Sequence, residues 1–140
     1  MTKKPKILIV DDEMLFAVLL QTSLALLGYE VCKPTATSTE AIEAAQREQP
    51  DIVLMDVRLA GGNDGIEVAR QIQSLCEAQI VFVSGYADGD MRHRAEQIHP
   101  LAYLIKPVTA VDILPILRDA ETSTAPSPNN EPLHLQDPKD

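Results

Sequence analysis

Apolar residues form five short runs along the chain, and each run is followed by a stretch with helical periodicity. The runs lie at 6–10, 30–36, 51–55, 80–84 and 102–106. Short, nearly continuous apolar runs are typical of parallel strands covered on both faces. Helices are predicted at 13–27, 37–48, 64–76, 88–98 and 109–120. Strand alternating with helix five times predicts an α/β fold, a doubly wound parallel sheet with helices on both faces.

Local signals support the ends of these elements. Gly28 follows the first helical stretch, as a C-terminal stop does. Thr37 and Glu40 have the spacing of a capping box, and Asp64 is a typical cap for the third helix. Pro34 weakens the second strand, because proline has no amide hydrogen and suits an edge or a strand end.

The first helix carries no charged side chain between Met14 and Tyr29. An i, i+3, i+4 path predicts its core face as Phe16, Leu19, Leu20, Ser23, Leu24 and Leu27. This path leaves Met14, Leu15, Val18 and Leu26 nearer the outside. Such a face is either a partly covered edge of the core or a docking patch for a partner.

Charge and composition narrow the class of protein. The 140 residues are enough for one domain, and a net charge of −9 without a basic stripe argues against nucleic acid as a partner. No apolar stretch reaches the length of a membrane span, and the two cysteines lack metal-ligand spacing. We therefore expect a soluble, cytoplasmic protein with a domain at 1–120 and a disordered, proline-rich tail at 121–140.

Polar residues stand at the ends of four predicted strands. In an open parallel sheet the carboxyl ends of the strands meet at the edge where ligands bind. The residues expected there are Asp11, Asp12 and Glu13 after the first run, Asp56 after the third, Ser84 after the fourth and Lys106-Pro107 after the fifth. Each alone is explained by a turn, a cap or a solvated surface residue. Together they predict one site.

Clustered carboxylates repel one another, so this site needs a cation. Oxygen ligands suit Mg²⁺, and Lys106 would add a second positive charge. A metal beside a free carboxylate, a hydroxyl and a lysine provides the groups that phosphoryl transfer requires. Asp56 is the candidate nucleophile, which would become an aspartyl phosphate.

Over residues 5–120 this pattern resembles the receiver (response regulator) domain of two-component signalling. The resemblance rests on Asp11, Asp12, Asp56, Ser84, Tyr103 and Lys106-Pro107, in order and spacing. It implies a flavodoxin-like five-stranded parallel sheet in the order 2-1-3-4-5 with five helices. It also implies that the domain catalyses only its own phosphorylation and dephosphorylation and is not a turnover enzyme.

The resemblance assigns the metal ligands. Asp12, Asp56 and the backbone carbonyl of Arg58 would bind Mg²⁺ (or Mn²⁺) directly, and Asp11 would act through water. Lys106 would bind a phosphoryl oxygen of the modified Asp56.

The resemblance also assigns a switch. Ser84 and Tyr103 would move on phosphorylation and change the surface of the fourth helix, fifth strand and fifth helix. A cis Lys106-Pro107 peptide would fix the lysine. Arg58 and Tyr86 occupy the two positions that tune hydrolysis of the acyl phosphate, and their bulk predicts a long-lived phosphorylated state.

The implied donor is a histidine kinase or histidine phosphotransfer protein, which would dock at Met14, Leu15 and Val18. A downstream protein target would receive the signal, and we expect a monomer or a weak, phosphorylation-dependent dimer. The domain could instead be a phosphate sink or relay, or a receiver excised from a larger hybrid kinase.

Three other functions are alternatives to a phosphorylated receiver. An aspartate-nucleophile phosphatase would need a second aspartate where Arg58 stands, and a flavin carrier would need a glycine- and hydroxyl-rich loop after the first strand. A degenerate receiver that binds partners without phosphorylation would not need the complete set of site residues.

Overall fold

The computed structural model describes residues 4–85 and 89–122. The strands are β1 (Lys6–Val10), β2 (Glu30–Val31), β3 (Ile52–Asp56), β4 (Gln79–Ser84) and β5 (Ala102–Ile105). The helices are α1 (Met14–Leu26), α2 (Ser38–Glu48), α3 (Gly65–Leu75), α4 (Gly89–Glu96) and α5 (Ala110–Thr122), with a 3₁₀ turn, η1, at Ala60–Gly62. The five predicted strand and helix pairs are thus all present.

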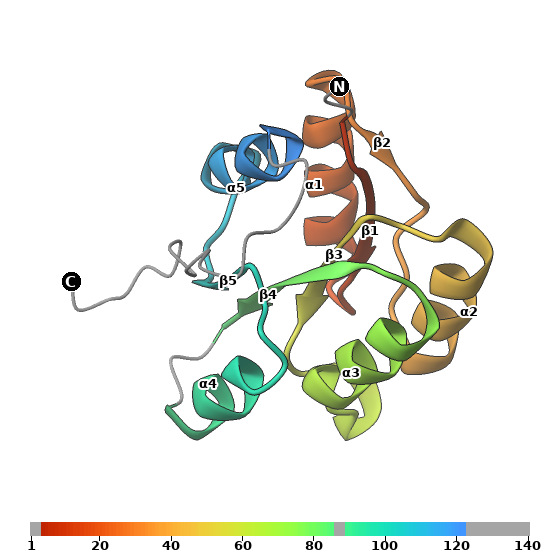
Figure 1. Ribbon diagram of the computed structural model, residues 1–140, viewed down its shortest axis with the longest axis vertical. Coiled ribbons are helices and arrows are strands. Elements are labelled where there is room, and N and C mark those ends of the chain that lie inside the picture. The colour runs from red at the N-terminus through yellow and green to blue at the C-terminus, as the bar shows by residue number, and fades with distance from the viewer. Residues whose placement is uncertain (1–3, 86–88, 123–140) are drawn as a thin grey trace.

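The strands form one parallel sheet in the order β2-β1-β3-β4-β5, which confirms the predicted topology (Figure 1). Alternate residues of a strand point to opposite faces. In β1, Ile7 and Ile9 pack in one apolar cluster with α1 and α5, whereas Leu8 and Val10 pack in the other with α2, α3 and α4. The sheet is therefore covered on both faces, as its apolar runs predict.

The predicted caps of two helices are formed. Thr37 Oγ1 accepts a hydrogen bond from Glu40 N at 3.1 Å, and Glu40 Oε1 accepts one from Ala36 N at 3.1 Å. Asp64 Oδ1 accepts hydrogen bonds from Ile66 N at 2.9 Å and Glu67 N at 3.4 Å. These bonds satisfy amide groups that have no partner within the helix, which explains where α2 and α3 begin.

The second strand is shorter than the predicted 30–36, because only Glu30 and Val31 form regular pairs with β1. Pro34 lacks the amide hydrogen that would continue the ladder. Pairing resumes beyond it, where Thr35 N donates to Ile9 O at 2.9 Å and Asp11 N donates to Thr35 O at 2.9 Å. The segment still follows β1 and holds the backbone just before the candidate site.

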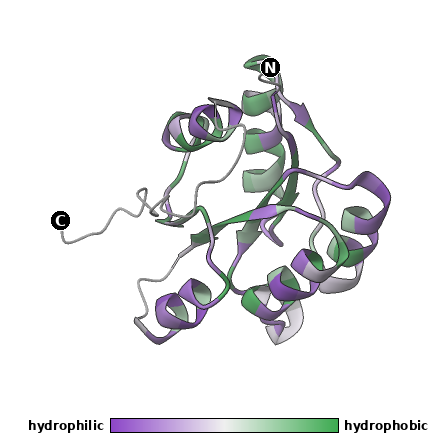
Figure 2. Cartoon of the chain, viewed as in Figure 1, coloured by the Kyte–Doolittle hydropathy of each residue, from purple (hydrophilic) through white to green (hydrophobic). Residues whose placement is uncertain are grey.

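The predicted core face of α1 is wrong in part. Leu20 and Leu24 are buried as expected, but Leu19 is 59% exposed and Leu27 is 45% exposed. Ser23 is also exposed, and Ala17, which was not predicted, is completely buried. Small size lets Ala17 sit closest to the sheet, so the buried stripe is rotated from the one predicted. In the view of Figure 2, α1 is coloured mostly hydrophobic, whereas α4 is coloured mostly hydrophilic.

The last helix extends beyond the predicted domain boundary at residue 120. Helix α5 includes Glu121 and Thr122, and Glu121 accepts a hydrogen bond from the buried Tyr29 hydroxyl. These two residues were predicted to begin a disordered tail. The remainder of that segment, 123–140, lies outside the described residues.

Candidate functional site

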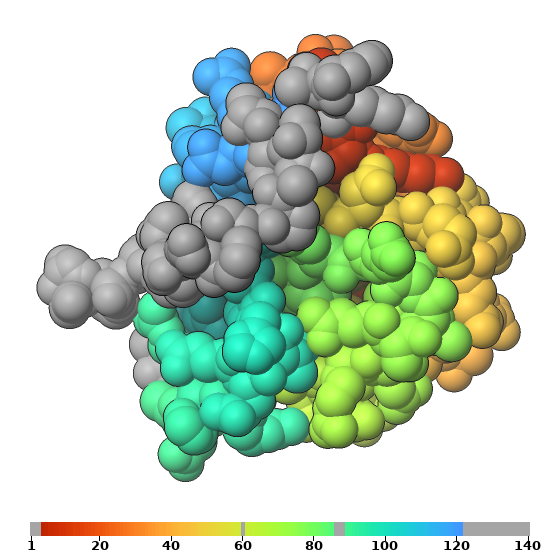
Figure 3. Space-filling view, viewed as in Figure 1, coloured from red at the N-terminus to blue at the C-terminus, as the bar shows by residue number. Residues whose placement is uncertain are grey.

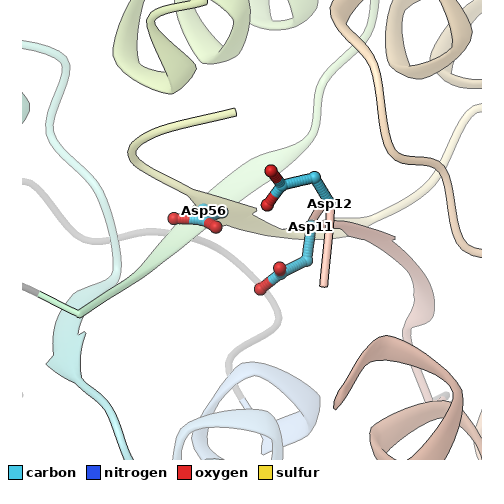
Figure 4. Close-up of side chains that lie close together, drawn as sticks. All are labelled: Asp11, Asp12 and Asp56. Carbon is cyan, nitrogen blue, oxygen red and sulfur yellow. The ribbon is translucent and has the colours of Figure 1, made fainter. Parts of the chain in front are cut away.

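The carboxylate cluster forms where β1 and β3 end side by side. The two strands pair in register up to Val10 and Met55, so Asp11 and Asp56 come next to one another at the carboxyl edge. Asp11 is 2% exposed and Asp56 is 7% exposed, while Asp12 lies at the surface. One carboxylate oxygen of each aspartate lies within 4.8 Å of the other two (Figure 4). The sequence predicts this meeting of three aspartates.

Three carboxylates at this spacing fit a hard divalent cation. Mg²⁺ prefers oxygen ligands and commonly binds one or two carboxylates together with water. Asp12 is exposed, which leaves the cluster open to solvent on one side. The donor set and its access therefore suit Mg²⁺ or Mn²⁺, and they offer no nitrogen or sulfur ligand that would favour a softer metal.

Lys106 approaches the same cluster from the end of β5. Its Nζ lies 3.0 Å from Asp11 Oδ2, 3.7 Å from Asp56 Oδ2 and 2.8 Å from Glu13 Oε1. The predicted cis Lys106-Pro107 peptide is present, and Lys106 N donates to Ser84 O at 2.7 Å. The lysine thus sits between the acceptor candidate and the first acidic group.

The electrostatics of the site follow from this crowding. Burial raises the pKa of Asp56 to about 6, and the Asp11 carboxylate acts in the same direction. The Arg58 amide and Lys106 oppose this rise, because both stabilise the ionised form. For Lys106, burial lowers the pKa, but the hydrogen bonds to Glu13 and Asp11 outweigh it and raise the pKa above its ordinary value. Lys106 is therefore a permanent cation at this edge.

We predict that Asp56→Asn stabilises the metal-free protein. A carboxyl whose pKa is raised on folding costs stability when ionised, so the full cost is present above about pH 6, shrinks as the pH falls below 6 and is gone below the ordinary aspartate pKa of about 3.9. At pH 8 the gain in the free energy of unfolding should be about 1 to 3 kcal/mol. Urea denaturation of both proteins between pH 5 and 8 measures it. A difference that grows towards low pH would contradict the assignment.

The predicted switch residues are both buried, on the neighbouring strands β4 and β5. Ser84 ends β4 and is 2% exposed, and Tyr103 on β5 is 4% exposed. The Tyr103 ring packs against Phe82, with 6.0 Å between ring centroids, and the guanidinium of Arg92 on α4 lies 5.5 Å from its centroid. Tyr103 thus links the sheet to α4.

Comparison with known proteins decides the family. The family model described as the response regulator receiver domain matches residues 7–118. The chain belongs to the response regulator receiver family. Receiver domains of this family are signalling domains of two-component response regulators. The acidic pair, the second acidic strand end and the lysine lie close together, as the resemblance to this family implies.

Several relatives show how far the similarity extends. The transcriptional regulatory protein PdtaR of Mycobacterium tuberculosis is 35% identical over 80% of this chain, and the match covers 54% of its own length. The chain therefore spans about half of that relative. Sporulation initiation phosphotransferase F of Bacillus subtilis is 29% identical, and the match covers 89% of this chain and 97% of that protein.

Solved structures agree on the fold. The signal receiver domain of a modulated diguanylate cyclase from Desulfovibrio desulfuricans G20 has a TM-score of 0.77 and 35% identity, covering 84% of this chain and 94% of that one. A response regulator from Burkholderia pseudomallei, crystallised with a phosphorylated aspartic acid, a calcium ion and citrate, has a TM-score of 0.74 and 28% identity. That match covers 80% of this chain and 65% of that one.

The structure describes all but one of the receiver's other predicted site residues. The Arg58 side chain is exposed, and its backbone N donates to Asp56 Oδ1 at 3.1 Å, so this residue is tied to the acceptor candidate. Tyr86, the second predicted modulator, lies outside the described residues. The predicted docking residues are exposed, with fractions of 42% for Met14, 76% for Leu15 and 43% for Val18.

Two contacts of the receiver site were not predicted from the sequence. Glu13 forms an ion pair with Lys106, and the Phe16 ring lies under the same lysine, with 4.7 Å from Nζ to the ring centroid. The signal for Glu13 was its place beside the acidic pair, but nothing in the sequence distinguished it from a helix cap.

Within the described part of the chain no helix is both long and apolar enough to span a membrane.

Proposed function

We propose that this receiver accepts a phosphoryl group on Asp56 in a Mg²⁺-dependent reaction and passes the change to its α4-β5-α5 surface. The observation that carries the proposal is the convergence of three aspartates and Lys106 at one edge of the sheet. The similar Burkholderia structure with a phosphorylated aspartic acid and a calcium ion supports it. Asp12 is exposed, so a donor could approach the cluster from the solvent side.

In the proposed reaction a carboxylate oxygen of Asp56 attacks the phosphorus of a phosphohistidine. A new O–P bond forms and the N–P bond breaks, with its electron pair returning to the donor imidazole. Asp12, Asp56 and the Arg58 carbonyl would hold Mg²⁺ directly and Asp11 through water, and the ion would supply positive charge for the phosphoryl oxygens. Lys106 would bind one of those oxygens, and the Ser84 hydroxyl and Tyr103 would rearrange around the new group.

The donor would be a histidine kinase or a histidine phosphotransfer protein. The domain would then act on no external substrate, since the only group modified is its own Asp56. A cytoplasmic location suits such donors. It also suits the two cysteines, Cys32 and Cys76, which are both free thiols.

A relay role is a second candidate, because the similarity to sporulation phosphotransferase F covers 97% of that protein. Transfer from the phosphorylated chain to a purified phosphotransfer protein would favour the relay.

The experiment that tests the proposal is incubation of the chain with Mg²⁺ and acetyl phosphate, followed by intact mass measurement. The wild type should gain one phosphoryl group, and Asp56→Asn should gain none. Omission of Mg²⁺ should remove the gain in the wild type. If the variant and the wild type gain the same mass, Asp56 is not the acceptor.

Docking of the donor is expected on the exposed N-terminal end of α1. Val18→Glu places a charge among Met14 and Leu15 and should slow transfer from the donor protein by about tenfold, because a charge would be buried in an apolar interface. Leu26→Glu, at the other end of α1, is the matched control. Phosphorylation by acetyl phosphate should be unchanged in both variants. Equal transfer rates for Val18→Glu and the wild type would exclude docking here.

The phosphorylated state should be long-lived, because Arg58 and Tyr86 are bulky and hinder the approach of water. The double variant Arg58→Ala/Tyr86→Ala should lose the phosphoryl group faster, by about threefold or more. Decay is followed by intact mass after removal of acetyl phosphate, with Arg70→Ala as a control for loss of a surface arginine. Decay as slow as in the wild type would refute the role of these two side chains.

A further inference from the structure

An ion pair joins the cap of α3 to α4. Arg94 Nη2 on α4 donates to Asp64 Oδ2, and the other oxygen of Asp64 caps α3 by accepting from Ile66 N. Figure 3 shows the atoms of α3 next to those of α4 and the segment that follows it, and Gln73 Nε2 on α3 donates to the carbonyl of Ile98, just after α4, at 3.1 Å. One oxygen of the Asp64 carboxylate thus caps α3, and the other binds Arg94 on α4.

The backbone of Asp64 is also connected to the candidate phosphorylation site. Asp64 and Arg58 form an isolated antiparallel bridge that closes the loop between β3 and α3. Arg58 N in turn donates to Asp56 Oδ1 at 3.1 Å. A continuous series of contacts therefore runs from Arg94 through Asp64 and Arg58 to Asp56.

The loop has little other freedom at this end. Gly65 N donates to Val57 O at 2.7 Å, and Leu59 N donates to Asn63 O at 3.0 Å. Asp64 is fixed between these bonds, so a force on its side chain acts on the strand end that carries Asp56. The loop tip, in contrast, contains Gly61 and Gly62 with positive φ values of 78° and 77°.

We propose that Arg94 is a positioning residue for the metal and phosphoacceptor site, acting from α4 through Asp64. This inference rests on the proposed function, and it names a path by which that site and α4 affect each other. The ion pair holds the loop so that the Arg58 backbone stays beside Asp56. By thermodynamic reciprocity, a change at the metal site must then change the environment of α4.

Loss of Arg94 should not release α4 from the domain. Ala95 of α4 is completely buried in the core, and Gln73 Nε2 on α3 donates to the Ile98 carbonyl at 3.1 Å. Arg94→Met keeps the apolar stem of the side chain and removes only the guanidinium. Because the side chains of Arg94 and Asp64 are 47% and 35% exposed, the expected effect is modest, about a two- to fivefold change in Mg²⁺ affinity.

The sign of this change separates positioning from simple electrostatics. Removing a positive charge near an acidic site should tighten Mg²⁺ binding if only the field matters. Positioning predicts the opposite, weaker binding in Arg94→Met. Arg70→Met is the matched control, because Arg70 pairs with Glu67 in a similarly exposed ion pair on α3.

The test measures Mg²⁺ affinity of the full 140-residue chain by calorimetry. We compare wild type, Arg94→Met, Arg94→Lys, Arg70→Met, Asp64→Asn and the Arg94→Met/Asp64→Asn double variant. Arg94→Met should bind Mg²⁺ about two- to fivefold more weakly, Arg94→Lys should be intermediate, and Arg70→Met should bind as tightly as the wild type or slightly more tightly. Asparagine retains the α3 cap, so the Arg94 effect should vanish in the Asp64→Asn background.

A second measurement follows α4 itself. On addition of Mg²⁺, the Ala95 amide resonance should shift in the wild type and Arg70→Met but not in Arg94→Met. Equal Mg²⁺ affinity in Arg94→Met and Arg70→Met, or an Arg94 effect that persists in the Asp64→Asn background, would overturn the inference. Absence of Mg²⁺ binding in the wild type and in Arg70→Met would instead refute the proposed function, so the two failures are distinguishable.

Discussion

Replacing Lys106 with methionine is expected to slow phosphorylation of Asp56 by about 100-fold or more, because charge on the phosphoryl oxygens would lose a preorganised cation. Lys106 Nζ lies within 4.0 Å of three acidic groups and is held by Phe16 below it. The measurement is the rate of mass gain with acetyl phosphate in saturating Mg²⁺.

Lys33→Met is the control for this variant, because Lys33 is an exposed lysine near the edge of the sheet. It should be phosphorylated at the wild-type rate. Circular dichroism in Mg²⁺ should show that both variants are folded, since Mg²⁺ can offset part of the repulsion that Lys106 relieves. Equal rates for Lys106→Met and the wild type would remove Lys106 from the mechanism.

Gly65→Ala should lower the free energy of unfolding by at least about 2 kcal/mol, because a Cβ there has no room. An added Cβ would lie 1.9 Å from the Asp56 carbonyl oxygen and 2.9 Å from its carbonyl carbon, which are backbone atoms. The start of α3 would have to move away from the end of β3. We therefore expect slower phosphorylation as well, measured beside urea denaturation.

The matched control is Gly89→Ala at the start of α4. A Cβ at that position meets nothing within 4 Å, and Gly89 has no positive φ, so alanine should leave stability unchanged or raise it slightly. If Gly65→Ala were as stable as Gly89→Ala, α3 would not press against the phosphoacceptor strand as described.

The sheet could be predicted because its apolar runs are short and bounded by clear signals. β3 and β4 are covered on both faces, so nearly every residue in them is apolar and the pattern is unambiguous. The second strand and the buried face of α1 could not be predicted in full. Pro34 interrupts an edge whose pairing resumes at Thr35, and α1 carries no charged residue to mark its outer face.

The site was predictable as far as it depends on strand ends. Asp56 is the last residue of β3, and Asp11 and Lys106 directly follow β1 and β5. The register of these strands brings the three residues together, and order in the sequence was enough to infer that. The role of Glu13 and the ion pair of Asp64 with Arg94 depend on how helices pack, which local pattern does not encode.

The most direct test of the central claim is to locate the phosphoryl group. The chain is phosphorylated with acetyl phosphate and Mg²⁺, the acyl phosphate is reduced with borohydride, and the resulting homoserine is mapped by peptide mass spectrometry. The account predicts homoserine at position 56 alone, and none when Mg²⁺ is omitted. Homoserine at position 11 or 12 instead, or an equal yield at position 56 without Mg²⁺, would contradict it.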